Sequence, residues 1–490
     1  MRCCYNFVLA VDAVEVRDMD RKKLIGLVAG VAIPIALIAL QPFAGLTMQG
    51  TAAFSILLGA IVWWIVGVLP DYVTALTMAA LFVLVADIPA DVTFSAFSSS
   101  TWWLLVCAFC MGLGMQRSGL LKRLSLSILD RFPHTFRAQA TGLMAAAFVT
   151  SPFIPSLAAK CAILTPIALS ISDQMGYERK SREANGLFLA LFTVIRNMGP
   201  AVISASFVGY VVLGLLPEDV QGQFDLIHWL LAALPWLVLV TVLNFAAIMV
   251  MFEPKVERAA RRARRGGAAK RGASVEHEDL GPMTLAEKQM LAIVGVAVLM
   301  WVFERWHGVP AYIVAIFAVV AMVFCGQFKN ADLRGGIAWE NILFMGVVLG
   351  LAPAFAYAGV DVWVVGSCAP LLTAFAGNPY AIVGIIAVVT LVLRFVIVSE
   401  TAFINIFMVF AVPLAPQLGI SPWIIGFCVY AMVNPWFTVY QNPVYIAAIG
   451  SVDSKMTDHA IQARFCAVYM AICFVALLAS VPYWQMLGLA

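Results

Sequence analysis

Charged residues are scarce in this chain, and long polar stretches are almost absent. Only 12% of the 490 residues are Asp, Glu, Lys or Arg, whereas 63% are hydrophobic. A soluble protein of this length could not bury so many unbroken apolar runs of about 20 residues, each of which is long enough to cross a bilayer. A transmembrane β-barrel would show short alternating segments instead. The composition therefore predicts an all-α polytopic membrane protein.

Residue patterns of the enzymatic kind are lacking as well. The 5 histidines show no metal-binding or nucleophile–base spacing, so neither a catalytic site nor a cofactor is predicted. Most of the 10 cysteines lie inside apolar runs, which argues against a disulfide framework. The N-terminal residues contain no small-residue cleavage site after a short apolar core, so a cleaved signal peptide is not predicted.

What the sequence does contain is an alternation of apolar spans with basic and acidic loops. Three consecutive basic residues precede the first span, residues 24–40, and predict a cytoplasmic N-terminus. The acidic loop at residues 87–100 is then expected outside. The segment 253–287 carries 8 Lys or Arg residues. A nucleic-acid site is one interpretation of such a run, but beside a span it is more typical of a cytoplasmic linker that touches anionic lipid.

Residues 138–171 form an apolar stretch that serines, prolines and Lys160 interrupt at its centre. Basic loops flank the stretch on both sides, so the chain must return to the side from which it entered. Two full crossings would need roughly 40 residues or more, which this stretch does not provide. It predicts a re-entrant hairpin with its tip at residues 152–160. Non-helical backbone at that depth in the membrane is tolerated only where other parts of the protein bury it or where it lines a water-filled cavity. The tip should therefore face a cavity.

The second half of the chain repeats this arrangement. The first hairpin is followed by a broken helix, residues 187–215, with its interruption predicted at Asn197 to Pro200. A second hairpin at residues 380–415 is followed by a second broken helix, residues 422–451. Neither flank of the second hairpin carries a basic residue, so this hairpin should enter from outside. Paired interrupted helices predict a binding site near the membrane midplane.

The complete pattern amounts to eleven spans and two opposed re-entrant hairpins. One leading helix, within residues 1–50, precedes two units of five spans, residues 51–252 and residues 288–490. Because five is an odd number, the two units have opposite orientations, which is the inverted-repeat arrangement of secondary transporters. The C-terminus is then expected outside.

Four charged side chains lie at the predicted tips and breaks. Lys160 belongs to the first tip and Glu400 to the second, while Arg196 and Arg394 stand just before a break and a tip. A charge inside the bilayer is expensive alone, so Lys160 and Glu400 are predicted partners, either for coupling or only for stability. The guanidinium groups could hold a substrate carboxylate or cap helix carbonyls. Helix N-termini at the same depth would add positive charge for an anion.

Short polar residues and helix breakers accompany these charges. Short polar side chains of this kind can bind substrate oxygens or sodium. Each of them, like Asn434, could instead form hydrogen bonds with backbone groups at a helix break. The predicted substrate-binding residues are Ser156, Lys160, Asn197, Gly199, Ser399, Thr401, Asn442 and Pro443. A sodium ion, if one is bound, is expected at Ser399, Thr401, Asn405 and Asn442.

This order of motifs resembles the divalent anion/sodium symporter family, which includes dicarboxylate and citrate carriers. The resemblance rests on Phe97-Ser-Ser-Ser-Thr-Trp-Trp-Leu-Leu and Gln116-Arg-Ser-Gly-Leu, and the layout matches from about Leu24 to the end. The resemblance implies that this chain has the fold of that family, transports by an elevator-type movement and forms a homodimer. In that family each hairpin tip carries Ser-Asn-Thr, which contacts substrate carboxylates and helps to frame sodium sites.

This chain departs from the family pattern at both tips. Ser156-Leu157-Ala158 and Ser399-Glu400-Thr401 occupy the places of Ser-Asn-Thr, and Lys160 stands where the family usually has a small neutral residue. Asn442-Pro443 matches the second broken helix, and Gly199-Pro200 matches the first more loosely. We expect Lys160 to supply the positive charge that sodium supplies in relatives. The carrier would then be sodium-independent, either an exchanger or proton-coupled through Glu400.

The sequence thus predicts a secondary transporter of a small organic anion, with a dicarboxylate as the first choice. It should lie in the inner membrane, with the bilayer and a second copy of the chain as partners and no nucleic acid. The alternative is a sodium/proton antiporter or a transporter of an inorganic oxyanion such as sulfate or arsenite. Glu400 favours this alternative, and the lack of further buried acids opposes it. A membrane-embedded enzyme or receptor should show a catalytic constellation or a soluble domain, and neither is evident.

Overall fold

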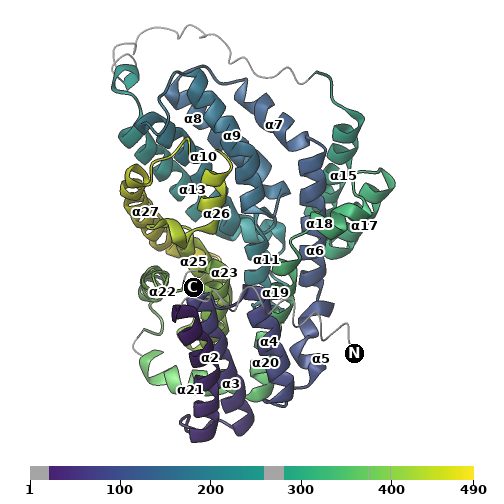
Figure 1. Cartoon of the computed structure of the whole chain (residues 1–490), viewed down its shortest axis with the longest axis vertical. Helices are drawn as coiled ribbons and strands as arrows, with labels where there is room; N and C mark the ends of the chain where they lie inside the picture. The colour runs from purple at the N-terminus through teal and green to yellow at the C-terminus, as the bar shows by residue number, and fades with distance from the viewer. Residues whose placement is uncertain (1–20, 259–280, 373–374, 398) are drawn as a thin grey trace. The chain divides into compact units, whose positions relative to one another are not determined.

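The computed structural model describes residues 21–258, 281–372, 375–397 and 399–490. Within these ranges every regular element is a helix, and no strand occurs (Figure 1). The all-α class predicted from the composition is confirmed for this part of the chain. The central part of the predicted basic linker and residues 1–20 lie outside the described residues.

The described residues form two compact units. The first unit contains the residues up to 97 together with residues 339–368, and the second contains residues 98–338 and 369–490. This partition follows contacts rather than sequence similarity. The division into inverted repeats, residues 51–252 and residues 288–490, stays a prediction.

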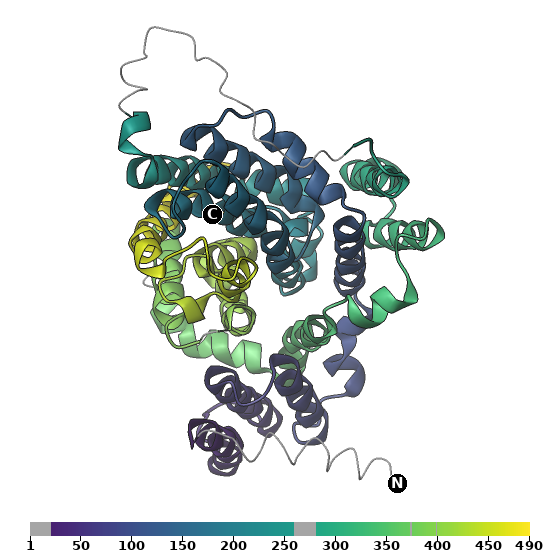
Figure 2. The ribbon, with the colours of Figure 1, turned by 45° about the horizontal axis from the view of Figure 1, so that its top comes forward.

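The first unit is an assembly of apolar helices. Its first two helices, α2 (Arg21–Leu40) and α3 (Met48–Val66), lie side by side (Figure 2). Their approach depends on glycine, because a Cβ atom on Gly59 would meet the carbonyl oxygen of Gly30. Small residues let membrane helices come close in this way. The other helices of this unit are α4 (Asp71–Leu84), α5 (Ala90–Thr93), α19 (Trp339–Leu349), α20 (Leu351–Ala358) and α21 (Val360–Leu372), and η2 (Ser95–Ser98) lies at its boundary.

The second unit contains a helix–turn–helix where the first hairpin is predicted. Helices α8 (Phe136–Thr150) and α9 (Leu157–Gln174) are joined through the short turn η3 (Ser151–Phe153). Both pack against α10 (Arg182–Ala201), as Figure 1 shows. Every residue of α10 from Ala184 onward is buried, so this helix forms the centre of the unit.

A second helix–turn–helix and a second interrupted helix occupy the C-terminal part of this unit. Helices α22 (Pro379–Leu393) and α23 (Glu400–Ala411) correspond to the predicted second hairpin. The predicted second broken helix consists of α25 (Pro422–Val433) and α26 (Pro443–Gly450). Helix α25 stops directly before Asn434-Pro435, which agrees with the predicted break. The elements between and after them are η5 (Val412–Leu414), α24 (Ala415–Leu418), η6 (Val439–Gln441) and α27 (His459–Met486).

The remaining helices of the second unit connect these motifs. Helices α6 and α7 form a bent pair with an angle of 64°, and α7 falls in a region for which the sequence predicts only a basic loop. The full set of these connecting helices is α6 (Ser100–Arg117), α7 (Leu120–Leu129), α11 (Phe207–Gly214), α12 (Glu218–Gln221), α13 (Leu226–Phe252), α15 (Leu285–Val302), α16 (Glu304–His307), α17 (Ala311–Phe324) and α18 (Asn330–Gly335).

Seven described helices are long and apolar enough to cross a membrane, or eight if α6 and α7 count as one bent span. This number supports a polytopic membrane protein. Four further apolar helices, α4, α17, α22 and α25, are shorter than that criterion requires. The count of eleven spans therefore stays a prediction.

The first break lies later in the chain than the sequence predicts. Helix α10 continues through Pro200 to Ala201, and the interruption is η4 (Ile203–Ala205). A proline inside a helix deprives the carbonyl four residues earlier of its N–H donor. Here that carbonyl belongs to Arg196, and the side-chain Nδ2 of Asn434 donates to it at 3.0 Å. This donor replaces the lost bond, and the helix continues through Pro200 and ends at Ala201.

Candidate functional site

The first tip contains the N-terminus of α9. After η3 the chain is extended at Ile154 and Ser156. The Oγ of Ser156 accepts a hydrogen bond from the N–H of Ala159 at 3.2 Å, which makes Ser156 the N-cap of α9. Because the helix begins at Leu157, Lys160 lies in its first turn. The prediction of a non-helical tip that reaches residue 160 was therefore too long.

The ammonium group of Lys160 is bound by backbone carbonyls. The side chain is completely buried. Its Nζ donates to the carbonyl oxygen of Ala205 at 2.6 Å and to that of Ser151 at 3.4 Å. Ala205 ends η4 and Ser151 begins η3, so both carbonyls lie where the regular helix is interrupted. A backbone bond of 2.8 Å from the N–H of Phe207 to the carbonyl of Pro155 also connects the tip with the break.

A buried ion pair connects the first break with the second tip. The Nη2 of Arg196 lies 3.1 Å from Oε1 and 3.0 Å from Oε2 of Glu400. The side chains are 0% and 9% exposed. Glu400 is the first residue of α23, where a negative charge also interacts favourably with the helix dipole.

The predicted pairing of Lys160 with Glu400 was therefore wrong. Glu400 instead takes the guanidinium of Arg196 as its partner, and Nη2 alone contacts both carboxylate oxygens. Lys160 is satisfied by carbonyl groups instead. Both charges are stabilised, but by different neighbours.

Arg394 repeats the arrangement of Lys160 in the other hairpin. Its Nη1 donates to the carbonyl of Ile397 at 2.9 Å, and its Nη2 donates to the carbonyl of Gln441. Ile397 lies in the second tip and Gln441 ends η6 in the second break. Each hairpin thus carries a cation that binds one carbonyl in its own tip and one at the neighbouring break. Of the two interpretations of Arg394, the geometry matches carbonyl capping.

Several of the predicted polar residues cap helices at the second tip and break. The Oγ of Ser399 accepts a bond from the N–H of Ala402 at 3.3 Å and lies 3.5 Å from the Oγ1 of Thr401. The Oδ1 of Asn442 accepts a bond from the N–H of Tyr445 at 3.0 Å, and Pro443 is the first residue of α26. These are the residue types that helix starts favour.

The asparagines around the ion pair are fully buried, and only some of their polar atoms are satisfied. The Oδ1 of Asn197 accepts a bond of 2.5 Å from the hydroxyl of Tyr469. Among the described residues, neither the Nδ2 of Asn197 nor either side-chain polar atom of Asn405 has a partner. The same holds for Nε and Nη1 of Arg196. The surroundings of the ion pair therefore contain buried donors that no group in the described part of the chain accepts from.

Gly199 permits a close contact beside this cluster. A Cβ atom at this position would lie 2.6 Å from the hydroxyl oxygen of Tyr430. Any larger residue would have to displace Tyr430, which is fully buried. A glycine at this position thus has a packing explanation, and the expectation that Gly199 binds substrate stays a prediction.

The structure adds partners that the sequence did not single out. Tyr469 and Tyr430 lie in apolar helices, where a tyrosine gives no sign that its hydroxyl faces a polar cluster. The carbonyls of Ser151 and Ala205 carry no side-chain signal at all. Gln441 stood beside a predicted residue and could have been included for that reason. In the described ranges, no group of three or more His, Cys, Asp or Glu side chains could hold a metal ion.

Comparison with known proteins places this chain in a family. The family model described as "Sodium:sulfate symporter transmembrane region" matches residues 21–490. Inner membrane protein YbhI of Escherichia coli is 25% identical over 400 residues, which cover 79% of this chain and 81% of that protein. The L-tartrate/succinate antiporter of the same species is 24% identical, over 75% of this chain and 79% of that protein. Chloroplastic dicarboxylate transporter 2 of Spinacia oleracea is 23% identical, over 78% of this chain and 68% of that protein.

Two solved transporter structures share the fold. The YdaH transporter of Alcanivorax borkumensis has a TM-score of 0.55 at 15% identity and covers 81% of this chain and 87% of that one. MtrF of Neisseria gonorrhoeae has a TM-score of 0.54 at 12% identity, with 95% of each chain covered. Because the family model covers nearly the whole chain, this protein belongs to the sodium:sulfate symporter family, the divalent anion/sodium symporters, and is a membrane transporter.

Proposed function

We propose that this chain is a secondary transporter that carries a small organic dicarboxylate without using sodium. The observation that carries the proposal is the set of buried cationic groups, Arg196 and Lys160, beside the two interrupted helices. The relatives named as a tartrate/succinate antiporter and a dicarboxylate transporter support the choice of substrate class.

The proposed anion site is built around Arg196. Its Nε and Nη1 atoms and the Nδ2 atom of Asn197 are buried donors without a partner among the described residues. An unsatisfied buried donor costs roughly 1–3 kcal/mol, so a ligand that accepts these bonds would be stabilised. A carboxylate has the acceptor geometry that a guanidinium matches best. The N-termini of α9 and α23 at the two tips would add partial positive charge.

Lys160 is the proposed replacement for sodium. Backbone carbonyls at unwound helix segments are typical sodium ligands in transporters. Here the carbonyls of Ser151 and Ala205 face an ammonium group that the chain itself supplies. A covalently attached cation keeps the charge at this place in every step of the cycle. A sodium site at Ser399, Thr401, Asn405 and Asn442 is therefore not part of the proposal.

Glu400 is the proposed coupling residue. Its carboxylate already occupies one face of Arg196, so a substrate carboxylate must share that guanidinium or displace Glu400. Displacement becomes easier if Glu400 takes up a proton, since a neutral carboxyl group binds a cation more weakly. In the exchange route, one substrate anion replaces another at Arg196, so the net charge of the site is the same before and after each cycle and no proton is needed. Both routes keep the transporter independent of sodium.

The proposed mechanism is an elevator movement in a homodimer of inverted repeats in the inner membrane. The matching contacts of Lys160 and Arg394 support the repeats, because each cation joins its own tip to the neighbouring break. The basic loops support a cytoplasmic N-terminus and an outer C-terminus. Single cysteines placed at Gln223 and Arg179 in a cysteine-free variant test the orientation. A membrane-impermeant maleimide should label only the first in intact cells, and the reverse pattern would contradict the proposal.

Uptake by proteoliposomes tests the transport function. We expect saturable uptake of radiolabelled succinate that excess tartrate inhibits and excess sulfate leaves unchanged. Succinate loaded inside the vesicles should accelerate uptake if the protein is an exchanger, and an inward proton gradient should do so if it is proton-coupled. Uptake of sulfate or arsenite in the absence of succinate uptake would favour an inorganic oxyanion transporter. Sodium-driven proton movement without anion uptake would favour an antiporter.

A further inference from the structure

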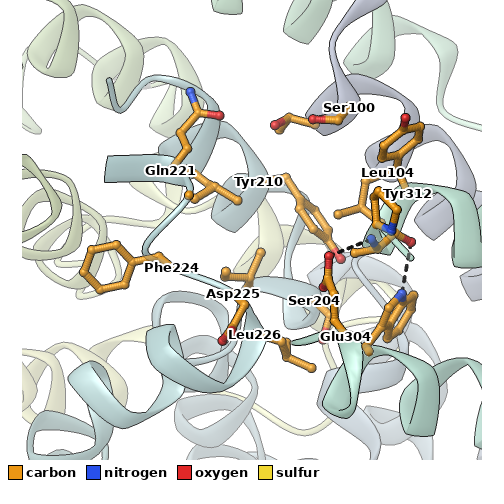
Figure 3. Close-up of a pocket in the computed structure, with 17 residues that line it drawn as sticks. Ser100, Leu104, Ser204, Tyr210, Gln221, Phe224, Asp225, Leu226, Glu304 and Tyr312 are labelled. Carbon is orange, nitrogen blue, oxygen red and sulfur yellow. Dashed lines mark hydrogen bonds between the residues drawn. The ribbon is translucent and has the colours of Figure 1, made fainter. Parts of the chain in front are cut away.

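A separate cavity lies in the second unit, and none of the predicted site residues lines it. Its volume is about 320 Å³. Its walls come from the start of α6, from the chain between η4 and α13, and from the connection between α15 and α17 (Figure 3). In the topology predicted from the sequence, which stays a prediction, all three regions lie on the outer side of the membrane.

The cavity is acidic. Asp225 and Glu304 line it, and the described side chains that line it include no Lys, Arg or His. The Oε1 of Glu304 accepts a bond from the N–H of Ala311 at 3.1 Å. Burial raises the pKa of Glu304 above its ordinary value and the charge of Asp225 adds to the rise, whereas the Ala311 N–H and His307 oppose it. The charge of this wall would repel a dicarboxylate, so the cavity does not suit the proposed substrate.

Asp225 remains ionised beside Glu304. Burial disfavours its charge, but hydrogen bonds from the backbone and ring of His228 outweigh this effect and hold the pKa of Asp225 below its ordinary value. The Oδ1 of Asp225 lies 2.8 Å from the His228 N–H and 2.7 Å from the ring Nδ1. A cation in the cavity would be attracted by this fixed negative charge.

Tyr210 supplies independent evidence for a ligand. The residue as a whole is only 4% exposed, and among the described residues no hydrogen bond to its hydroxyl is found. Figure 3 shows the hydroxyl directed into the cavity toward Glu304. A buried tyrosine hydroxyl usually finds a partner. Ser204, which is 7% exposed, lines the same wall.

We propose that this cavity binds a small organic ammonium ion from the outer side of the membrane. Carboxylates attract the positive charge, and the rings of Tyr210, Tyr312 and Trp301 provide the aromatic surface that such cations prefer. A bare metal ion would leave most of this volume unfilled, and the two carboxylates do not form part of any larger metal-binding group in the described ranges. The volume is at the small end of ligand pockets, which range from roughly 300 to 1,000 Å³.

The bound cation would also contact the first broken helix. Ser204 precedes Ala205, whose carbonyl accepts the bond from Lys160. The proposal does not depend on the transport function, because binding can be measured without any substrate or gradient.

Calorimetric titration of the purified full-length protein with choline tests the proposal. We expect saturable binding, and we expect the uncharged isostere 3,3-dimethyl-1-butanol to bind at least about tenfold more weakly. Glu304→Gln should weaken choline binding by about tenfold or more. Tyr210→Phe should weaken it severalfold, and this variant should fold because the hydroxyl bonds to no described residue. Glu218→Gln is the matched control, since Glu218 is exposed and does not line the cavity.

Three results would overturn the proposal. The first is the lack of saturable choline binding to the unmodified protein. The second is equal binding of choline and its uncharged isostere, which would indicate a merely apolar cavity. The third is calcium binding that displaces choline and depends on Glu304, which would indicate a metal site.

Discussion

Replacement of Lys160 by alanine should convert a sodium-independent transporter into one that needs sodium. The substitution removes a buried positive charge and leaves the carbonyls of Ser151 and Ala205 without their donor. It also leaves a space beside them that was filled by the lysine side chain. Carbonyl oxygens in such a space are suitable ligands for a hard cation such as sodium.

The size of the effect follows from the contacts that are lost. A hydrogen bond to a charged group contributes about 1.5–3 kcal/mol, which corresponds to about a tenfold to hundredfold change in an equilibrium constant. We expect Lys160→Ala to reduce succinate uptake in potassium buffer by at least about tenfold. The loss of folding stability should be small, because two unsatisfied carbonyls cost about 1–3 kcal/mol each while the burial of one ammonium costs several kcal/mol.

The assay is the initial rate of succinate uptake by proteoliposomes in potassium buffer and in sodium buffer. Sodium should restore part of the activity of Lys160→Ala. It should not restore the activity of Lys160→Met, because the methionine side chain fills the space. Lys288→Ala is the control, since Lys288 is an exposed lysine at the start of α15.

Two outcomes would refute the reasoning about Lys160. Full activity of the alanine variant in potassium buffer would show that the ammonium has no role in transport. Equal rescue of the alanine and methionine variants by sodium would show that the cation acts elsewhere. Gel filtration of each variant should show the same elution volume as the unmodified protein.

Three further predictions concern the buried cluster and the acidic cavity. Arg196→Met should lower stability by about 3–5 kcal/mol because it leaves Glu400 charged and unpaired, and a second change, Glu400→Met, should recover most of the loss in a thermal unfolding assay. Gly199→Ala should lower stability by about 1–3 kcal/mol through the clash with Tyr430, and adding Tyr430→Phe should relieve part of it. Choline binding should weaken as the pH falls through the raised pKa of Glu304, because protonation removes its charge; titration calorimetry at several pH values measures this.

Each of these predictions can fail. An Arg196→Met protein as stable as the double variant would mean that Glu400 is not held by this pair. A Gly199→Ala protein with unchanged stability would mean that Tyr430 moves freely. Choline binding that does not change with pH, or that strengthens as the pH falls, would exclude Glu304 as the group that attracts the cation.

The helical hairpins could be predicted from sequence because their signals are local. The length of residues 138–171, the prolines at its centre and the basic loops around it are all visible in one stretch of chain. The burial of Lys160 followed from the apolar residues on both sides. A helix–turn–helix in the structure covers the same residues.

The partners of the charged residues could not be predicted in this way. Arg196 and Glu400 are 204 positions apart in the chain, and no local pattern states which buried cation will meet which carboxylate. Pairing Lys160 with Glu400 assumed that a lysine needs an acid, whereas carbonyls at two helix interruptions satisfy it. The position of the first break was misjudged for a similar reason, since the helix continues past Pro200 with the help of Asn434.

The measurement that tests the central claim most directly is the sodium dependence of the unmodified protein. Initial rates of succinate uptake are compared with sodium, and with potassium in its place, on both sides of the proteoliposome membrane. If the ammonium of Lys160 takes the place of sodium, the two rates should agree within experimental error. A rate that falls to background when sodium is replaced would contradict the account.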